Sequence, residues 1–331
     1  MANKFRNLVF EGGGVKGVAY GGALQALQQM DILQHIKRVA GTSAGAITAA
    51  LLAVGYTPGE LTDILKHTDY NKFKDADWGV FRNFDRLLEK YGWNKGKSFK
   101  KWIAKLIRAK TGSADTTFAE LDEMARDDDS NFLKLWVVGT DLSEQKYQIF
   151  STETTPNTRL QDAVRISMSI PFFFQCVRNI EKDVLVDGGV TYNYPLNIFD
   201  WKRYVDRDDN AETVEYQDHP EYVFNHETLG FRLDTKDEMK YEARDWGNVP
   251  RDIDNIVDFS MAIMTFMYES ANKAHLHKND WNRTVFIDSL GVKTTDFDIT
   301  PEEVEALIDS GRKGVQEHFH WRNGENGMDR P

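Results

Sequence analysis

A serine between two glycines is the clearest sign of chemistry in this 331-residue sequence. Residues 36–55 read as a short apolar strand, the pentapeptide Gly-Thr-Ser-Ala-Gly at 41–45, and an apolar helix. A sharp strand-to-helix turn exposes the oxygen of Ser43, and side chains at Gly41 and Gly45 would crowd the turn and block a substrate. The positive end of the helix would lie where negative charge develops. Ser43 is a candidate nucleophile, although a glycine-rich loop entering a core helix also fits the pattern.

A second glycine-rich loop, at residues 12–17, follows a predicted strand at 7–10 and leads into a helix with an apolar stripe. Backbone N–H groups in such a loop point outward together, which suits an anion. The spacing Gly12-x-Gly14-x-x-Gly17 also fits the dinucleotide-binding fingerprint, but the acidic residue that would hold the ribose is missing. A phosphate-binding P-loop fails too, because no Ser or Thr follows Lys16. An oxyanion hole or a structural turn remains.

A carboxylate follows the predicted strand at residues 184–186, in the sequence Asp187-Gly188-Gly189. Asp-Gly pairs commonly form hairpin or loop turns, and this motif alone indicates no more than a turn. If it is functional, Asp187 would be a base held at the end of a core strand, with glycines that let backbone and substrate approach.

Composition narrows the class of protein. The chain has 41 Lys and Arg against 52 Asp and Glu, a net charge of -11, which argues against nucleic acid as the main partner. A single cysteine, Cys176, excludes an internal disulfide and a multi-cysteine metal site. The longest apolar stretches are shorter than the ~20 residues of a membrane span, and no signal peptide is recognisable. We therefore expect a cytoplasmic protein, at most peripheral at a membrane.

The remaining elements alternate between helix and strand. Capping boxes begin helices near Thr57, Thr117 and Thr300, and we expect the last of these helices to end at Ser310. Further predicted strands lie at 133–138, 146–150, 228–233 and 284–287, and further helices at 158–168 and 253–272. Charged runs at 200–250 indicate a polar surface insertion.

A basic amphipathic helix is predicted at residues 97–110. Its lysines could rest on an anionic lipid surface, which would give a transient membrane contact. The alternative is a helix that packs its apolar side on the core and leaves its lysines in solvent.

Three motifs, in this order, resemble the patatin-like phospholipase family: Gly-Gly-Gly-Val-Lys-Gly at 12–17, Gly-Thr-Ser-Ala-Gly at 41–45 and Asp-Gly-Gly at 187–189. Segments 117–121, 163–171 and 296–300 are similar to that family as well. The resemblance implies an α/β fold, a three-layer α/β/α sandwich with a mostly parallel sheet and a helical lid-type insertion at about 56–130. The catalytic core would span 5–200, and 201–331 would continue the same domain with a polar surface insertion and C-terminal helices.

The resemblance also implies a lipid acyl hydrolase that cleaves carboxylic esters of phospholipids or other acyl-ester substrates. Ser43 would be the nucleophile and Asp187 its base, in a Ser-Asp dyad that needs no histidine, metal or cofactor. The oxyanion hole would come from Gly12, Gly13 and Gly14. Motif support would come from Lys16, Gly17, Gly41, Gly45, Gly188 and Gly189.

Two alternatives stay open. A Ser-His-Asp esterase or lipase of another hydrolase type is compatible with the chain order, since six histidines follow Asp187: His219, His226, His275, His277, His318 and His320. A non-catalytic lipid-binding protein on the same fold could keep the elbow without turnover.

Overall fold

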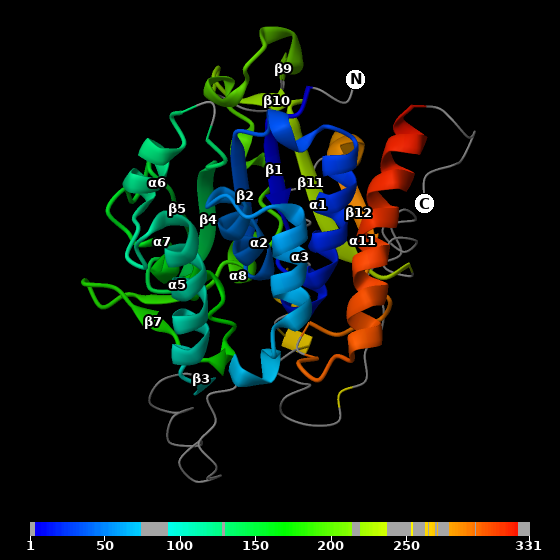
Figure 1. The fold of residues 1–331 in the computed structure, drawn as a ribbon. Coiled ribbons are helices and arrows are strands. Elements are labelled where there is room, and N and C mark those ends of the chain that lie inside the picture. Colours follow the sequence, from blue (N-terminus) through cyan, green and yellow to red (C-terminus); the bar gives the residue numbers. More distant parts are fainter. Residues whose placement is uncertain are drawn as a thin grey trace.

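A mixed sheet of eight strands forms the centre of the molecule (Figure 1). The computed structural model describes residues 4–73, 92–127, 130–213, 219–236, 253, 262–263, 265–268, 270, 278–294 and 296–323. The strands run in the order β12-β11-β1-β2-β4-β8-β7, and β5 also pairs with β4. The first five are parallel to one another, whereas β8, β7 and β5 are antiparallel to their neighbours. Their bounds are β1 (Asn7–Phe10), β2 (Arg38–Thr42), β4 (Lys134–Asp141), β5 (Lys146–Phe150), β7 (Val177–Arg178), β8 (Val184–Asp187), β11 (Thr228–Asp234) and β12 (Thr284–Asp288).

Seven helices and two small sheets complete the larger elements of the described chain. The helices are α1 (Ala19–Gln29), α2 (Ala44–Ala53), α3 (Pro58–His67), α5 (Lys97–Thr111), α6 (Phe118–Met124), α7 (Leu160–Ser167) and α11 (Pro301–Arg322), with the single-turn α8 (Gly189–Tyr192). The small sheets pair β3 (Gly92–Asn94) with β6 (Phe172–Phe174), and β9 (Ala211–Thr213) with β10 (Val223–Asn225). In the described ranges, every helix is too short or too polar to span a bilayer.

The alternation of side chains along the strands separates two cores. Leu8 and Phe10 of β1 face one side, where they pack in one cluster with residues of α1, α2, α3, α5, α7 and α11. Val9 of β1 and Trp136 of β4 face the other side, which is covered by residues 192–204. These residues include the end of α8 and the 3-10 turns Leu196–Phe199 and Lys202–Tyr204. The layered, mostly parallel α/β sandwich implied by the resemblance is thereby confirmed.

One predicted helix end was wrong. The last helix was expected to stop at Ser310, but α11 continues to Arg322. A glycine follows Ser310 because α11 packs closely on α1: a Cβ atom at Gly311 would lie 1.9 Å from the backbone oxygen of Ala19. Gly311 therefore serves helix packing, and does not end the helix.

Several other predictions can be compared only in part. The capping boxes at Thr57, Thr117 and Thr300 form as predicted, each accepting from the backbone N–H three residues on. The predicted helix 253–272 is described only in part. Its residues are helical at 262–263, 265–268 and 270. Apart from these and Ile253, it lies outside the described residues. Parts of the polar segment 200–250, at 214–218 and 237–250, also lie outside them.

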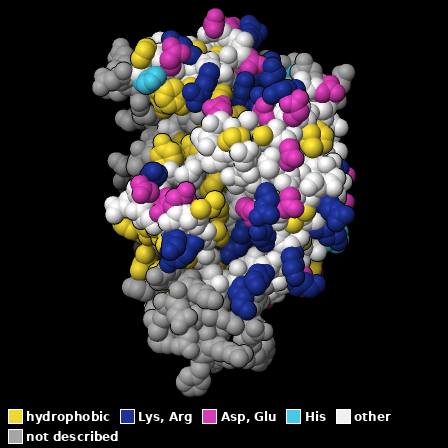
Figure 2. All heavy atoms as spheres, turned by 90° about the vertical axis from the view of Figure 1, so that its left-hand side faces the viewer, with side chains coloured by type: hydrophobic (Ala, Val, Ile, Leu, Met, Phe, Trp, Pro, Cys, Tyr) yellow, Lys and Arg dark blue, Asp and Glu magenta, His cyan; other side chains and the backbone are white. Residues whose placement is uncertain are grey.

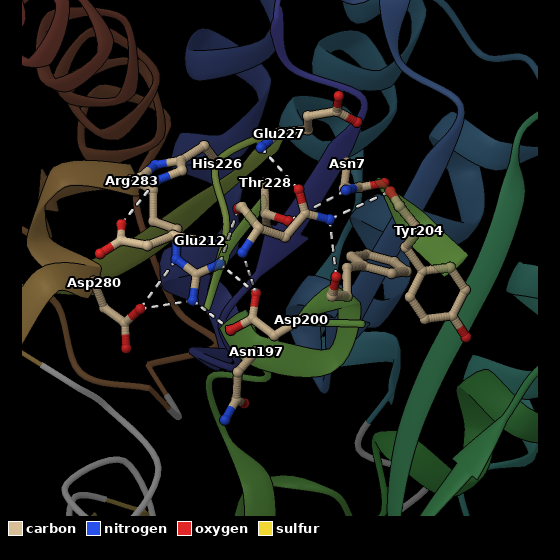
Figure 3. A network of polar contacts seen from close by, with 12 residues as sticks. Asn7, Asn197, Asp200, Tyr204, Glu212, His226, Glu227, Thr228, Asp280 and Arg283 are labelled. Atoms are coloured by element: carbon tan, nitrogen blue, oxygen red, sulfur yellow. Dashed lines mark hydrogen bonds and ion pairs between the residues drawn. The ribbon is translucent and has the colours of Figure 1, made fainter. Parts of the chain in front are cut away.

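A buried ion cluster fixes the layer at 192–204 to the amino ends of the parallel strands (Figure 3). The guanidinium of Arg283, just before β12, donates to Asp200 at 2.5 and 2.6 Å and to Asp280 at 2.7 Å. Asn225, just before β11, donates to the backbone oxygens of Phe199 and Tyr204. Every acidic group here is paired with a cation or a backbone donor, so this end of the sheet has a structural role.

Candidate active site

Ser43 occupies a strained turn at the carboxyl end of β2. Its backbone lies at φ 53° and ψ -123°, a region that residues with side chains rarely adopt. A Cβ atom at Gly41 would lie 2.2 Å from the backbone oxygen of Gly45, and one at Gly45 would lie 2.2 Å from that of Phe10. Gly41 is therefore required for the turn itself, and Gly45 for the close packing of the turn against β1. Helix α2 begins at the next residue, so its amino end lies beside the serine.

Asp187 ends β8, on the far side of β4 from Ser43. In the sheet register Thr42 pairs with Val138 of β4, and Asp187 pairs with the next residue of β4, Gly139. Ser43 and Asp187 thus belong to strands on either side of β4, about two strand spacings or 10 Å apart along the sheet. The Ser43 hydroxyl lies near enough to Asp187 to lower the pKa of that carboxyl, although its hydrogen bond in the described chain is to Met168 Sδ at 3.5 Å.

The Asp187 carboxyl is completely buried. Burial raises its pKa from 3.8 to about 7, because a charged carboxylate is poorly solvated there. The Gly189 amide, which donates to Oδ1 at 2.8 Å, opposes this rise, as do the hydroxyls of Ser43 and Tyr268. A carboxyl with this pKa can act as a base near neutral pH.

The end of α7 supports both residues. The Ser43 amide donates to Ser167 Oγ at 2.8 Å, and that hydroxyl donates to the Val138 backbone oxygen at 2.6 Å. The Asp187 amide donates to the backbone oxygen of Ser169 at 3.0 Å. One segment, 167–169, therefore sets the backbones of the serine and the aspartate relative to each other. In the sequence, segment 163–171 carries a resemblance to a family but no sign of this supporting role.

The glycine loop at 12–14 lies against Ser43. A Cβ atom at Gly12 would be 3.0 Å from Ser43 Cβ. The Gly12 amide donates to the Asn193 backbone oxygen at 3.1 Å, whereas the amides of Gly13 and Gly14 donate to no acceptor in the described part of the chain. Of the three glycines predicted to hold an oxyanion, Gly13 and Gly14 keep their amides available in this geometry.

The other predicted motif residues surround this loop. Lys16 Nζ donates to the backbone oxygen of Leu233 on β11 at 3.3 Å. A Cβ atom at Gly17 would be 2.8 Å from Ala44 Cβ, and one at Gly188 would be 2.3 Å from the Val138 backbone oxygen. Lys16 therefore fixes the loop to the sheet, and the two glycines allow close packing around the elbow.

A cavity of about 220 Å³ lies beside the glycine loop. Its lining includes Gly12, Lys16, Asn193 and Tyr268. Asn193 Nδ2 donates to Glu11 Oε1 at 3.2 Å, so this side chain connects the loop to the chain after Asp187. Residue types and spacing alone indicate no role for Asn193 or for Tyr268.

The described histidines lie in other surroundings. His226 pairs with Glu212 at 3.0 Å, His219 packs edge-on against Trp201, and His318 packs against Phe319 and Trp321 on α11. In the described chain no histidine hydrogen-bonds to Ser43 or Asp187; His275 and His277 lie outside it. Within the same ranges no group of three or more His, Cys, Asp or Glu side chains is arranged to hold a metal ion.

Comparison with known proteins gives one family and several relatives. A family model described as "Patatin-like phospholipase" matches residues 8–200. The uncharacterized protein R571 of Acanthamoeba polyphaga mimivirus is 28% identical over 320 residues, 96% of this chain and 94% of that protein. The uncharacterized protein YqhO of Bacillus subtilis (strain 168) is also 28% identical over 320 residues, 93% of this chain and 96% of that protein. The "probable lipid hydrolase 463L" of invertebrate iridescent virus 6 is 29% identical over 200 residues, 59% of this chain and 63% of that protein.

Solved structures share the fold at low sequence identity. VipD from Legionella pneumophila superposes with a TM-score of 0.58 at 18% identity, over 96% of this chain and 67% of VipD. ExoU, in its complex with SpcU from the type III secretion system of Pseudomonas aeruginosa, superposes with a TM-score of 0.52 at 19% identity. That match covers 96% of this chain and 52% of ExoU, so the chain spans about half the length of ExoU.

Proposed function

The chain belongs to the patatin-like phospholipase family, and from that membership and the site geometry we propose that it is a metal-independent lipid acyl hydrolase with a Ser43-Asp187 dyad. The observation that supports the proposal is the strained elbow at Ser43, whose hydroxyl lowers the pKa of the buried Asp187 carboxyl. The viral relative called a probable lipid hydrolase supports a lipid ester as substrate. Phospholipid, lysophospholipid and neutral acyl ester all contain the bond that this chemistry cleaves.

The proposed reaction has two steps. Ser43 Oγ attacks the ester carbonyl while Asp187 takes its proton, and the amides of Gly13 and Gly14 stabilise the negative carbonyl oxygen. The C–O bond to the alcohol then breaks, and the alcohol leaves with the proton held by Asp187. Water, deprotonated by the same carboxylate, then attacks the acyl-enzyme; the bond between the acyl carbon and Ser43 Oγ breaks, Asp187 returns the proton to Ser43 Oγ, and the fatty acid is released.

Product analysis tests the proposal directly. The protein is incubated with vesicles of mixed phospholipids, lysophospholipids and neutral glycerides, and the released products are identified by mass spectrometry. We expect free fatty acid and the matching deacylated lipid. A fluorophosphonate probe should label Ser43 covalently, whereas a non-catalytic lipid-binding protein would release no product and stay unlabelled.

The pH dependence of kcat/KM should reflect Asp187. Because only the carboxylate form can accept the Ser43 proton, and burial raises its pKa to about 7, activity should rise with pH to a half-maximum near pH 7. About a tenfold loss per pH unit is expected well below that value. Initial rates on a soluble short-chain p-nitrophenyl ester between pH 5 and 9 give the profile. A rate that is constant from pH 5 upward would contradict a buried carboxyl base.

We further propose that the basic face of α5 makes a transient contact with an anionic membrane. The apolar residues Phe99, Ile103 and Ile107 are buried in the core, so only the charged side of α5 is available to lipid. On that side Lys101, Lys105 and Arg108 are exposed. Figure 2 shows this side of the molecule, where Lys and Arg side chains are interspersed with Asp and Glu. Such a surface favours a weak, salt-sensitive contact over stable anchoring.

Charge reversal tests this contact. Each basic residue near an anionic surface contributes about 1 kcal/mol, so the triple variant Lys101→Glu, Lys105→Glu, Arg108→Glu should bind phosphatidylserine vesicles at least tenfold more weakly at low salt. Sedimentation with vesicles measures the bound fraction. The control variant Lys313→Glu changes an exposed lysine on α11 and should bind as the original protein does. Equal binding by all three proteins would contradict a role for α5.

A further inference from the structure

Tyr268 packs directly against the loop that carries Asp187. It lies in the helical segment 265–268, is 8% exposed, and shares an apolar cluster with Val186 and Val190 on either side of the aspartate. A Cβ atom at Gly189 would lie 2.8 Å from both Cε1 and Cζ of the Tyr268 ring. The last glycine of the Asp-Gly-Gly motif therefore makes room for this tyrosine, and its hydroxyl end is the part nearest to the loop.

Two buried polar atoms at this contact lack a hydrogen bond within the described residues. Tyr268 Oη and Asp187 Oδ2 are both inaccessible to solvent, and neither makes a hydrogen bond with the described residues. Such orphaned groups are costly and rare in folded proteins. The tyrosine hydroxyl nevertheless lies close enough to lower the pKa of Asp187 in part, and burial beside that carboxylate raises the pKa of Tyr268 well above 10. The hydroxyl thus keeps its proton and can act only as a donor toward a charged neighbour.

We propose that Tyr268 is a positioning residue for the catalytic base, whose hydroxyl donates to Asp187 Oδ2 while the Gly189 amide holds Oδ1. The inference rests on the proposed role of Asp187. With both oxygens held, the carboxylate is fixed in the plane that faces Ser43. A donor to the charged form also favours the carboxylate over the carboxylic acid, so the tyrosine keeps a larger fraction of the enzyme competent below neutral pH.

No other ionisable group in the described chain competes for this role. The carboxylate is faced by the Ser43 hydroxyl from the elbow, the Tyr268 hydroxyl, and the Gly189 amide from α8. The adjoining strand β4 presents Gly139 at this register, and no described charged side chain shifts the pKa of Asp187. The Tyr268 hydroxyl can therefore be removed without disturbing another charge.

The variant Tyr268→Phe tests the proposal through the pH profile, because phenylalanine keeps the ring and removes only the hydroxyl. We expect the half-maximum of kcat/KM to move up by about one pH unit, activity at pH 6 to fall roughly tenfold, and activity at pH 9 to recover to within about threefold. The rate of Ser43 labelling by the fluorophosphonate should move in the same way, and it requires no knowledge of the natural lipid. The control Tyr56→Phe removes a hydroxyl that donates to the Leu106 backbone oxygen at 2.9 Å, and should leave the profile in place.

The outcomes separate this inference from the proposed function. If the original protein is active, Ser43→Ala is inactive, and Tyr268→Phe keeps the original half-maximum, then the positioning role is wrong and the hydrolase assignment stands. An equal loss at every pH would indicate a packing role only and would also overturn the inference. If the original protein neither turns over an ester nor reacts with the probe, the proposed function fails first, and the role of Tyr268 fails with it.

Discussion

Replacing Ser43 by alanine should lower kcat/KM for an acyl ester by about four orders of magnitude or more. The substitution removes the atom that attacks the carbonyl and leaves the oxyanion amides and the binding surface unchanged, so only a small residual rate is expected. Fluorophosphonate labelling should disappear with it. Rates on a soluble ester and intact-protein mass spectrometry after labelling measure both effects.

The loss should not come from unfolding. Alanine keeps the Cβ atom of serine, so the strain of the backbone at φ 53° is unchanged, and the Ser43 amide can still donate to Ser167. We expect the free energy of unfolding in urea to stay within ~1 kcal/mol of the original. Ser113→Ala, at an exposed position after α5, is the matched control and should keep full activity. Retention of more than one-tenth of the original rate by Ser43→Ala would mean that another residue attacks the ester.

The elbow around Ser43 could be predicted because its glycines and the strand and helix that flank it are adjacent in the sequence, although the atom that requires Gly45 belongs to Phe10 on β1. The turn needs small residues at 41 and 45, since the backbone oxygens of Gly45 and Phe10 lie where their Cβ atoms would be. Glycine at those two positions is therefore visible in the sequence itself. The strands and capped helices were predictable for the same reason, because apolar period and capping residues act within a few positions of one another.

The partners of the serine could not be predicted from the residues alone, because their positions depend on sheet register. Asp187 approaches Ser43 only because β8 pairs antiparallel to β4 and stops opposite Gly139. No local pattern encodes that stop, and an Asp-Gly pair read alone indicates a turn. Tyr268 lies about 80 positions further on, in a helix whose apolar pattern does not distinguish a core tyrosine from one that faces a carboxylate. Family resemblance, and not periodicity, carried the expectation for Asp187.

The burial of Asp187 should lower the free energy of unfolding when its carboxyl is charged. The pKa of Asp187 is about 7 in the folded protein and 3.8 when the carboxyl is exposed in the unfolded chain. Between these two pH values the folded protein therefore keeps a proton on Asp187 that the unfolded chain has released. The free energy of unfolding therefore falls as pH rises through this window, by at most on the order of 4 kcal/mol for a difference of about three pH units. Above pH 7 the full cost is present, which is also where the proposed base is active.

Asp187→Asn should separate these two effects. The amide cannot accept the Ser43 proton, so kcat/KM at pH 8 should fall by about three orders of magnitude. Because the asparagine amide carries no charge to bury, the same variant should unfold at a higher urea concentration than the original protein at pH 8. This difference in stability should shrink by pH 5, because Asp187 of the original protein takes up its proton there. Urea denaturation at both pH values measures this, with the exposed Asp208→Asn as control. The opposite result would be a variant that is less stable than the original protein at pH 8 and closer to it at pH 5. That result would mean that the fold stabilises the Asp187 charge. A carboxylate stabilised in that way would be too weak a base to activate Ser43.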